Sequence, residues 1–405
     1  MPAESPSPPA TAEVVLTFLE SVGRRSEAEL YLELFRHLPR ESFAIIAAEA
    51  QVVKYATGSL VEQLRVLSEL SLYAPVVVGL FVPEGAAERA ARLGERLAGV
   101  GLTSPVHDAA EPDLVDRLRQ ELRAGAFPVV AFPPAAGEDL DQRFSRLGAV
   151  AGGLGTRKLV VLRRRGALGK NGLRRHELSP GHVLPTHGGR ISLVNLQTDY
   201  DLLAASRLLE RDDLVLLERL RALLAAPESK GMLASVAAPL GLLTELFTVR
   251  GAGTLVKSGS VIRRHACYDG LDIERLRALL ETTFGRSLLP GFFERPLLAL
   301  YLEEGYRGAA LIEAAEPAPY LSKFAVDPVA QGEGMGRDLW QAIVRDHPSF
   351  FWRSRPENPI AGWYTGLCDG MLRRPRWQIF WRGIAADGIA RVVEGAEGRA
   401  ADFEG

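Results

Sequence analysis

A glycine-rich stretch, Gln331–Gly336, joins an apolar run that predicts a strand, Tyr320–Val326, to a run that predicts a helix, Arg337–Arg345. Glycines at such a junction let the backbone approach a ligand closely, and the free N–H groups and dipole of a helix N-terminus attract a phosphate or pyrophosphate. The glycine spacing differs from the dinucleotide fingerprint and from the P-loop, and a plain strand-to-helix turn is the alternative interpretation. The candidate diphosphate-binding residues are Gln331, Gly332, Gly334, Met335 and Gly336.

Two arginines, Arg353 and Arg355, stand in the aromatic stretch Phe351–Arg355, which predicts a half-buried strand. A guanidinium on a rigid element binds a carboxylate through two parallel hydrogen bonds. The alternative, an exposed strand with two solvated arginines, does not explain the flanking aromatic residues, which favour burial. The pair therefore predicts a ligand with two carboxylates.

The order of these motifs resembles the acetyltransferase domain of the vertebrate-like N-acetylglutamate synthases, which are GCN5-related acetyltransferases. That family carries Tyr-Leu-x-Lys-Phe, Gln-Gly-x-Gly-x-Gly, Phe-Trp-Arg-Ser-Arg-x-x-Asn-Pro, Trp-Tyr, Asp-Gly and Trp-x-x-Phe-Trp. All appear here in order, at 320–324, 331–336, 351–359, 363–364, 369–370 and 377–381. The resemblance implies acetyl transfer from acetyl-CoA to the α-amine of L-glutamate, the first step of arginine biosynthesis, without a metal.

The resemblance also implies roles for single residues. Glutamate binding falls on Lys323, Arg353, Arg355 and Asn358. Acetyl-CoA binding falls on the glycine loop and on the backbone of Phe324, Ala325 and Val326, whose N–H groups would bind the oxyanion. Tyr364 matches the residue that contacts substrate or protonates the CoA sulfur. A solvated strand lysine and a structural aromatic are the alternatives for Lys323 and Tyr364.

This chain departs from the family beside Tyr364. Ala361-Gly362 and Thr365 stand where Asn-Pro and Phe are usual. Smaller side chains there would loosen the wall next to Tyr364, so the departure affects the role of Tyr364 more than the roles of the arginines.

Two segments, Arg190–Leu196 leading into Asp199 and the string Glu245–Leu255, resemble the acetylglutamate kinase branch of the amino acid kinase family. The resemblance covers roughly residues 20–260. In that family two glycine-rich turns bring backbone N–H groups onto phosphates.

Both phosphate turns are altered in this chain. Ala47 stands where a lysine is usual, and Glu49 and Ala50 replace two glycines. A like charge about 4 Å from a phosphate costs about 4 kcal/mol at an effective dielectric of 20. The second turn, Gly79–Pro83, lacks the histidine and most of the glycines. We therefore predict that the domain transfers no phosphate.

Related kinases and synthases bind L-arginine, the end product of their pathway, in this domain, between an N-terminal helix and the Glu-Leu-Phe-Thr region. The resemblance places such an allosteric site on Tyr31, Glu245, Gly251 and Gly253. The alternative is that the glycines only form a turn and that Glu245 only caps a helix or forms an ion pair.

Short apolar runs alternate with amphipathic segments in the first 250 residues, which predicts a three-layer α/β domain. The expected strands are Phe43–Ala48, Val76–Phe81, Pro128–Phe132 and Lys158–Leu162, and the expected helices are Leu60–Leu70, Glu88–Ala98 and Asp113–Arg123. The later pattern is that of an α+β acetyltransferase: an Asp272-capped helix, a hairpin of Leu297–Leu302 with Gly308–Glu313, and strands around the glycine loop. We expect a disordered leader at 1–20, a kinase-like domain at 21–268 and an acetyltransferase domain at 269–405.

Composition and charge limit the possible partners and the cellular location of the protein. A net charge of −2 does not indicate a protein that binds nucleic acid. The Arg163–Arg165 and Arg174–Arg175 clusters are expected in a solvated loop. No run is long and apolar enough to predict a membrane span. Two cysteines indicate the cytoplasm, and the seven histidines form no ligand-spaced cluster. The resemblance also implies a homo-oligomer, in this family a tetramer.

The prediction is an N-acetylglutamate synthase with a regulatory, kinase-dead N-terminal domain. A bifunctional synthase and kinase, an acetylglutamate kinase, and a non-catalytic arginine-sensing or partner-binding protein are the alternatives.

Overall fold

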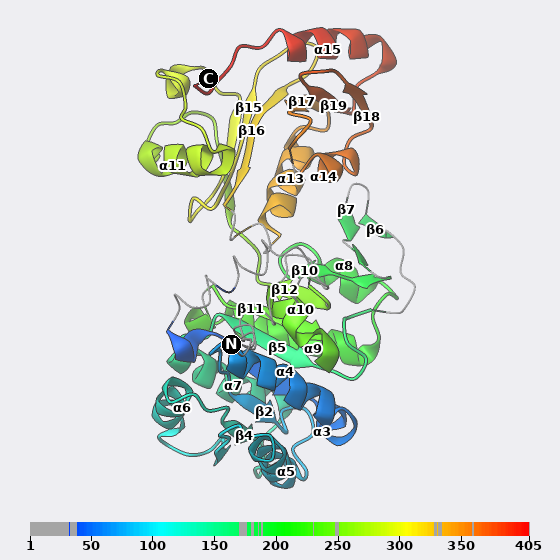
Figure 1. Ribbon diagram of the computed structural model, residues 1–405. Coiled ribbons are helices and arrows are strands. Elements are labelled where there is room, and N and C mark those ends of the chain that lie inside the picture. Colours follow the sequence, from blue (N-terminus) through cyan, green and yellow to red (C-terminus); the bar gives the residue numbers. More distant parts are fainter. Residues whose placement is uncertain are drawn as a thin grey trace, which may run out of the picture. The chain divides into compact units, whose positions relative to one another are not determined.

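A computed structural model shows two compact units, and the chain passes from the first to the second between Gly259 and Ser260 (Figure 1). The expected boundary followed Tyr268. The difference arises because β13, Ile262–His265, pairs with a strand of the second unit. The structure describes residues 32, 39–169, 176–179, 182–184, 186–187, 189–229, 231–247, 251–327, 330, 334–358 and 360–404.

The first unit is built on an eight-stranded sheet in the order β10-β12-β11-β5-β1-β2-β4-β3. Its neighbouring strands are parallel except β11 and β12, which are antiparallel. The strands are β1 (Ile45–Ala48), β2 (Val76–Val78), β3 (Val106–Asp108), β4 (Val129–Ala131), β5 (Lys158–Leu162), β10 (Leu193–Asn195), β11 (Leu233–Ala237) and β12 (Thr254–Lys257). Two small hairpins adjoin it, formed by β6 (His176–Ser179) with β7 (His182–Leu184) and by β8 (Thr186–His187) with β9 (Arg190–Ile191).

Helices cover both faces of this sheet because alternate residues of its strands enter two separate cores. In β1, Ile46 and Ala48 enter one core, whereas Ile45 and Ala47 enter the other. The first core includes α3 (Ala50–Tyr55), α4 (Thr57–Glu69), α5 (Ala86–Ala98) and α10 (Leu242–Phe247). The second includes α6 (Leu114–Arg123), α7 (Leu140–Leu154), α8 (Tyr200–Ala205) and α9 (Arg211–Ala225). The predicted three-layer α/β fold is confirmed.

Strand β2 is shorter than the expected run to Phe81. It ends at Val78 because Gly79 has φ of +90°, and a Cβ there would lie 2.5 Å from the carbonyl oxygen of Phe132. Glycine, which has no Cβ, allows the backbone of this turn to come this close to the carbonyl oxygen of Phe132, and the first position of the turn is still a glycine in this chain.

The second unit contains a seven-stranded sheet in the order β13-β14-β15-β16-β17-β19-β18, in which only β16 and β17 are parallel among the described strands. After β13, its strands are β14 (Ala299–Glu303), β15 (Gly308–Glu313), β16 (Tyr320–Val326), β17 (Phe350–Ser354), β18 (Gly370–Arg373) and β19 (Gln378–Arg382). The predicted hairpin is confirmed as β14 and β15. This is the expected α+β unit.

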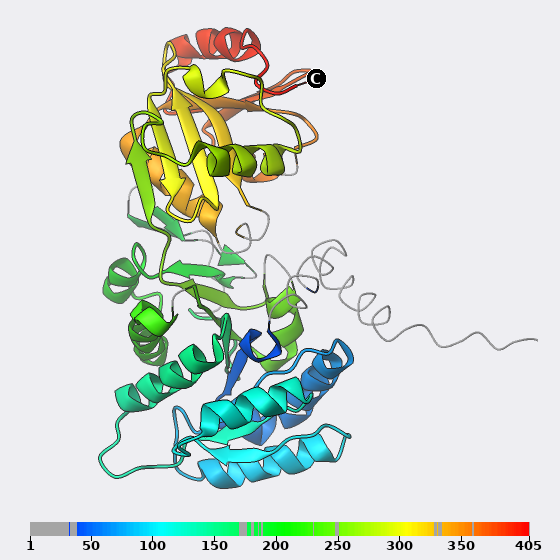
Figure 2. The ribbon, with the colours of Figure 1, turned by 90° about the vertical axis from the view of Figure 1, so that its left-hand side faces the viewer.

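Helices cover both faces of this second sheet as well. Helix α11 (Ile273–Phe284) packs on one face, with α15 (Ile389–Glu397), and α13 (Met335–Asp346) and α14 (Ala361–Thr365) pack on the other (Figure 2). The predicted cap of α11 is confirmed, because the Asp272 side chain accepts a hydrogen bond from the Arg275 N–H at 3.1 Å.

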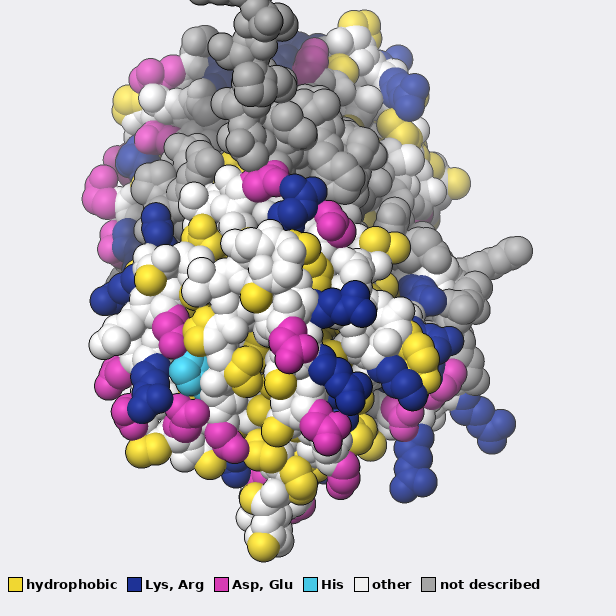
Figure 3. Space-filling view, turned by 60° about the horizontal axis from the view of Figure 1, so that its bottom comes forward, with side chains coloured by type: hydrophobic (Ala, Val, Ile, Leu, Met, Phe, Trp, Pro, Cys, Tyr) yellow, Lys and Arg dark blue, Asp and Glu magenta, His cyan; other side chains and the backbone are white. Residues whose placement is uncertain are grey.

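Basic and acidic side chains are interspersed on the face of the first unit that Figure 3 shows. None of the described helices has the length and apolar character needed to cross a membrane. Within the same residues, no three His, Cys, Asp or Glu side chains are placed to hold a metal ion. Both cysteines, Cys267 and Cys368, are free thiols.

Candidate functional site

The parallel strands β16 and β17, both fully described, pair in register only at Tyr320 and Phe351. Further along β16, Phe324 and Ala325 have register partners in β15 alone. Backbone N–H groups seek a hydrogen-bond partner, and those of β16 that point away from β15 at this level can bind a ligand. The pairing of β16 with β17 therefore does not extend to Phe324 and Ala325, two of the residues where oxyanion binding was predicted.

Helix α13 begins beside these residues. A Cβ added to Gly336 would lie 3.6 Å from the ring of Phe324 and 3.8 Å from Val326, so the first turn of α13 packs on the end of β16. Gly334 precedes the helix with φ of +73°, a conformation that only glycine adopts readily. The helix N-terminus, which favours anions, thus adjoins the strand edge.

The remaining residues of the predicted diphosphate cradle divide into two groups. Met335 is buried at the start of α13. Gln331 and Gly332 lie outside the described residues. The described part of the cradle is therefore Gly334, Met335 and Gly336.

Tyr364 lies on α14 within an aromatic cluster on the α13 side of the sheet. Its ring centroid is 5.5 Å from that of Trp352 and 6.3 Å from that of Phe324. Burial raises the pKa of Tyr364 above its ordinary value, so the phenol keeps its proton at neutral pH. The raised pKa also makes the phenol a weaker acid, and its tight packing fits the structural alternative.

Lys323 lies on the opposite face of the same sheet. Its Nζ is 5.1 Å from the ring centroid of Phe292 and 5.3 Å from that of Phe403. It forms an ion pair with Asp402 and is only 3% exposed, so it is not the solvated lysine of the alternative interpretation. Burial lowers the pKa of Lys323, and the Asp402 carboxylate offsets part of that effect.

The two arginines differ in their surroundings. Arg353 donates to the carbonyl oxygens of Ala396 at 2.6 Å and Ala400 at 3.1 Å. Each of the two guanidinium carbons lies 4.1 Å from the ring centroid of Trp377. Arg355 is exposed, and within the described part of the chain no group accepts a hydrogen bond from its side chain. Arg355 is therefore the more available of the pair to a ligand.

Asn358 organises the turn that leads into α14. Its side-chain oxygen accepts a hydrogen bond from the N–H of Ile360 at 3.1 Å, and its backbone carbonyl accepts one from Ala361 at 3.0 Å. These contacts give Asn358 a local structural role in this arrangement.

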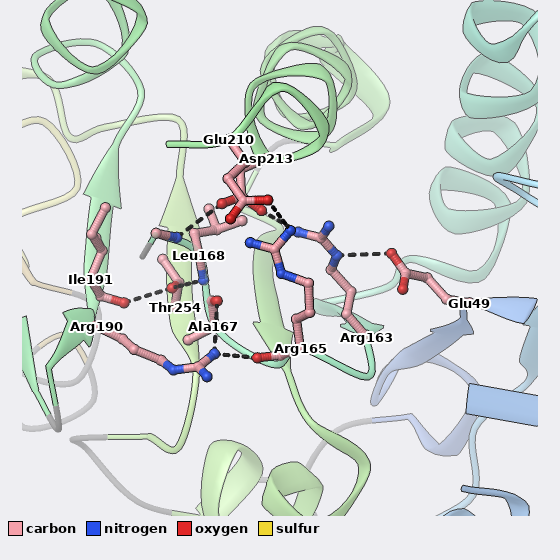
Figure 4. A network of polar contacts seen from close by, with 11 residues as sticks. Glu49, Arg163, Arg165, Ala167, Leu168, Arg190, Ile191, Glu210, Asp213 and Thr254 are labelled. Atoms are coloured by element: carbon pink, nitrogen blue, oxygen red, sulfur yellow. Dashed lines mark hydrogen bonds and ion pairs between the residues drawn. The ribbon is translucent and has the colours of Figure 1, made fainter. Parts of the chain in front are cut away.

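In the first unit, the altered phosphate turn at the end of β1 is part of a buried ion network (Figure 4). The Nε of Arg163 donates to a carboxylate oxygen of Glu49 at 2.8 Å, and its Nη1 donates to Asp213 at 2.6 Å. The N–H of Gly169 donates to the other oxygen of Asp213 at 3.0 Å. Ala47 is fully buried in the second core, so no amine is presented there.

This network corrects two expectations. Arg163 was expected in a solvated loop but is buried, because Glu49 and Asp213 together compensate its charge. Glu49 was expected to repel a phosphate as a free carboxylate but is bound to Arg163. Burial raises the pKa of Glu49, and Arg163 offsets only part of that effect. Arg174 and Arg175 lie outside the described residues.

Glu245, one of the predicted arginine-binding residues, holds the turn that follows α10. Its Oε2 accepts hydrogen bonds from the N–H groups of Ala252 at 3.0 Å and Gly253 at 2.9 Å. A Cβ on Gly251 would come within 2.4 Å of the same oxygen. Tyr31 lies outside the described residues. The described contacts are therefore those of the structural alternative.

Sequence reasoning missed Arg295 and Asp402. Arg295 forms an ion pair with the same carboxylate as Lys323. The available signal was Phe403, a large aromatic residue between two acidic ones, which indicates that this segment packs onto the domain.

The match to a protein family falls within the second unit. Residues 262–398 match the family model described as "NAT, N-acetyltransferase, of N-acetylglutamate synthase". The mitochondrial N-acetylglutamate synthase of Mus musculus is 30% identical over 441 residues, covering 95% of this chain and 79% of the mouse protein. An acetylglutamate kinase of Xanthomonas campestris is 29% identical, covering 88% of this chain and 94% of that protein. The synthase of Danio rerio is 42% identical over 151 residues, covering 36% of this chain and 28% of that protein.

Proposed function

Since the chain belongs to the N-acetylglutamate synthase family, we propose that it transfers the acetyl group of acetyl-CoA to the α-amine of L-glutamate. The amine nitrogen attacks the thioester carbonyl and loses a proton as the amide forms, and the carbon–sulfur bond breaks as the leaving thiolate gains a proton, so the reaction balances. Acetyl-CoA is a substrate, and the reaction as written needs no metal.

The observation that carries the proposal is the junction of α13 with β16. Gly336, in the first turn of α13, lies close to Phe324 and Val326. At Phe324, β16 pairs with β15 but not with β17. A diphosphate at the helix N-terminus would therefore hold its thioester arm close to backbone donors for the oxyanion.

Protonation of the leaving thiolate falls to Tyr364. A phenol is protonated at neutral pH, and the ring of Tyr364 lies 6.3 Å from that of Phe324 on β16. Glutamate binding falls to Lys323 and Arg355, with Arg353 and Asn358 supporting the strand and the turn beside them.

A thiol-release assay tests the proposal. The full chain is incubated with acetyl-CoA and, in turn, L-glutamate, L-glutamine, L-aspartate and other amino acids. We expect CoA release that depends on L-glutamate and is much weaker with L-glutamine, which lacks the second carboxylate. Release that is equal with every amino acid, or absent with all of them, would overturn the acceptor assignment.

We further propose that the first unit transfers no phosphate, although several relatives are named acetylglutamate kinases. Ala47 provides no amine for a phosphate, and Arg163 and Asp213 bind each other rather than a ligand. Opening this network for a nucleotide would leave a buried charge without a partner, which is costly.

The first unit is proposed instead to bind L-arginine as an effector, and the assembly to be a homo-oligomer. Calorimetry with the full chain tests the effector site. We expect L-arginine binding that is lost in Glu245→Ala, because the turn at 251–253 loses the acceptor of its N–H groups. Glu62→Ala, which removes an exposed carboxylate paired with Arg65, is the control and should bind normally. Binding that persists in Glu245→Ala refutes this placement.

A further inference from the structure

Two cations of the second unit converge on one carboxylate. Lys323 on β16 and Arg295, which follows a short 3-10 turn, each bind a different oxygen of Asp402. Ring faces of Phe292 and Phe403 flank the ammonium group at 5.1 and 5.3 Å. The arrangement is a carboxylate-binding site with apolar walls, and its present occupant belongs to the chain itself.

The occupant is carried by the segment Arg399–Glu404, which lies beyond the last residue matched by the family model, residue 398. Asp402 accepts a backbone hydrogen bond from Leu289 at 3.0 Å, and Glu404 donates one to Ser287 at 3.0 Å. The same segment provides the Ala400 carbonyl that accepts from Arg353. One segment thus occupies two of the cationic side chains to which glutamate binding was assigned.

A substrate carboxylate cannot reach Lys323 while Asp402 is in place. Lys323 is 3% exposed, and its Nζ also lies 3.3 Å from the hydroxyl and from the carbonyl oxygen of Ser322. The aspartate side chain ends in the same CH₂–COO⁻ group as glutamate. The chemistry that holds Asp402 is therefore the chemistry that would hold the side-chain carboxylate of the substrate.

We propose that Lys323 and Arg295 form the subsite for the side-chain carboxylate of glutamate, and that Asp402 is an internal occupant that glutamate displaces. This rests on the proposed function. It adds Arg295 as a specificity-determining residue and makes the affinity for glutamate depend on how often the segment leaves. If the subsite is open about one-tenth of the time, the apparent KM for glutamate is about 10-fold higher than that of the open site.

The test compares Asp402→Asn and Arg295→Ala with the parent chain in steady-state thiol release. Asp402→Asn removes the competing charge, so KM for glutamate should fall about 10-fold while KM for acetyl-CoA stays within 2-fold. Arg295→Ala weakens the binding of Asp402 and of glutamate alike, so its effect is measured in the Asp402→Asn background, where it should raise KM for glutamate about 10-fold or more. Glu304→Gln, which neutralises an exposed carboxylate paired with Arg263 in the same unit, is the control. It should change neither constant.

A permanent clamp predicts the opposite results. If Asp402 only holds the fold together, Asp402→Asn raises KM for glutamate or lowers kcat/KM for both substrates alike, and either result overturns the inference. If Asp402→Asn does not fold, Phe403→Ala tests the displacement of the segment instead. It removes the ring contact with Phe284, at 4.9 Å, and should also lower KM for glutamate. An unchanged or raised value refutes displacement.

Failure of the inference can be told apart from failure of the proposed function. A parent chain that shows no glutamate-dependent CoA release, and no glutamate binding by calorimetry, refutes both. A parent chain that turns over glutamate normally, with constants unaffected by Asp402→Asn, refutes the internal occupant alone.

Discussion

Arg353 and Arg355 are two residues apart on one strand, and the structure predicts that their loss has different consequences. Arg353→Ala removes two charged hydrogen bonds, to Ala396 and Ala400, and one contact with the ring of Trp377. Each such hydrogen bond is worth about 1 kcal/mol on a partly exposed side chain, and the ring contact about 0.5–1 kcal/mol. We expect a destabilisation of about 2–3 kcal/mol, or about 6–9 °C in the Tm of a unit of about 150 residues.

Arg355→Ala removes only the ring contact, so its Tm should fall by about 3 °C or less. If Arg355 binds a carboxylate of glutamate, kcat/KM for glutamate falls by about 10- to 150-fold, the equivalent of 1.5–3 kcal/mol. Binding of acetyl-CoA should survive, because the diphosphate site is on another element.

The assay combines thermal unfolding with thiol-release kinetics on the same preparations. Arg376→Ala is the matched control, because Arg376 is an exposed arginine 5.8 Å from the same ring. If Arg355→Ala and Arg376→Ala have the same kinetic constants, Arg355 does not contact glutamate. If Arg353→Ala unfolds at the temperature of the parent chain, the hydrogen bonds to Ala396 and Ala400 do not stabilise the unit.

Three further predictions follow from the site. Gly334→Ala and Gly336→Val should raise KM for acetyl-CoA far more than KM for glutamate. The control is Gly285→Ala, at a glycine of this unit that also has a positive φ, and it should raise neither KM. Equal effects on the two KM values would refute the assignment of the diphosphate site. Incubation with ATP, Mg²⁺ and N-acetylglutamate should give no acyl phosphate trapped as hydroxamate, and a signal lost on changing Asp199 would show that the first unit is a kinase. The pH dependence of unfolding should report Asp402: burial alone would raise its pKa, but Lys323 and Arg295 outweigh this and hold it below the ordinary value. Its ion pairs therefore stabilise the unit above the unfolded pKa of about 3.9 and are lost as pH falls through the lower folded pKa, so the parent should lose more stability than Asp402→Asn between about pH 5 and pH 2.

Elements with strong local patterns were predictable from the sequence. The apolar run Lys158–Leu162 is a strand with those bounds, because it is buried on both faces and bordered by polar residues. The sequence did not indicate β3, since Val106 is exposed and the strand has three residues. The sequence of β13 indicates a polar junction rather than a strand, because its arginines face solvent at the edge of the sheet.

Partners distant in the chain were not predictable. Arg163 and Asp213 are 50 residues apart, and Lys323 and Asp402 are 79 residues apart. Residue types indicated charged groups but not which of them compensate one another on folding. For this reason Arg163 was expected in solvent and Lys323 was expected to be free for a ligand. The junction of α13 with β16 was predictable because the glycines and the strand are neighbours in sequence.

Identification of the product tests the central claim most directly. The full chain is supplied with acetyl-CoA labelled in the acetyl group and with L-glutamate, and the products are followed by mass spectrometry. We predict N-acetylglutamate carrying the label, formed in equal amount to free CoA and absent when L-glutamate is omitted. Release of CoA without labelled N-acetylglutamate, or no release under these conditions, would contradict the assignment.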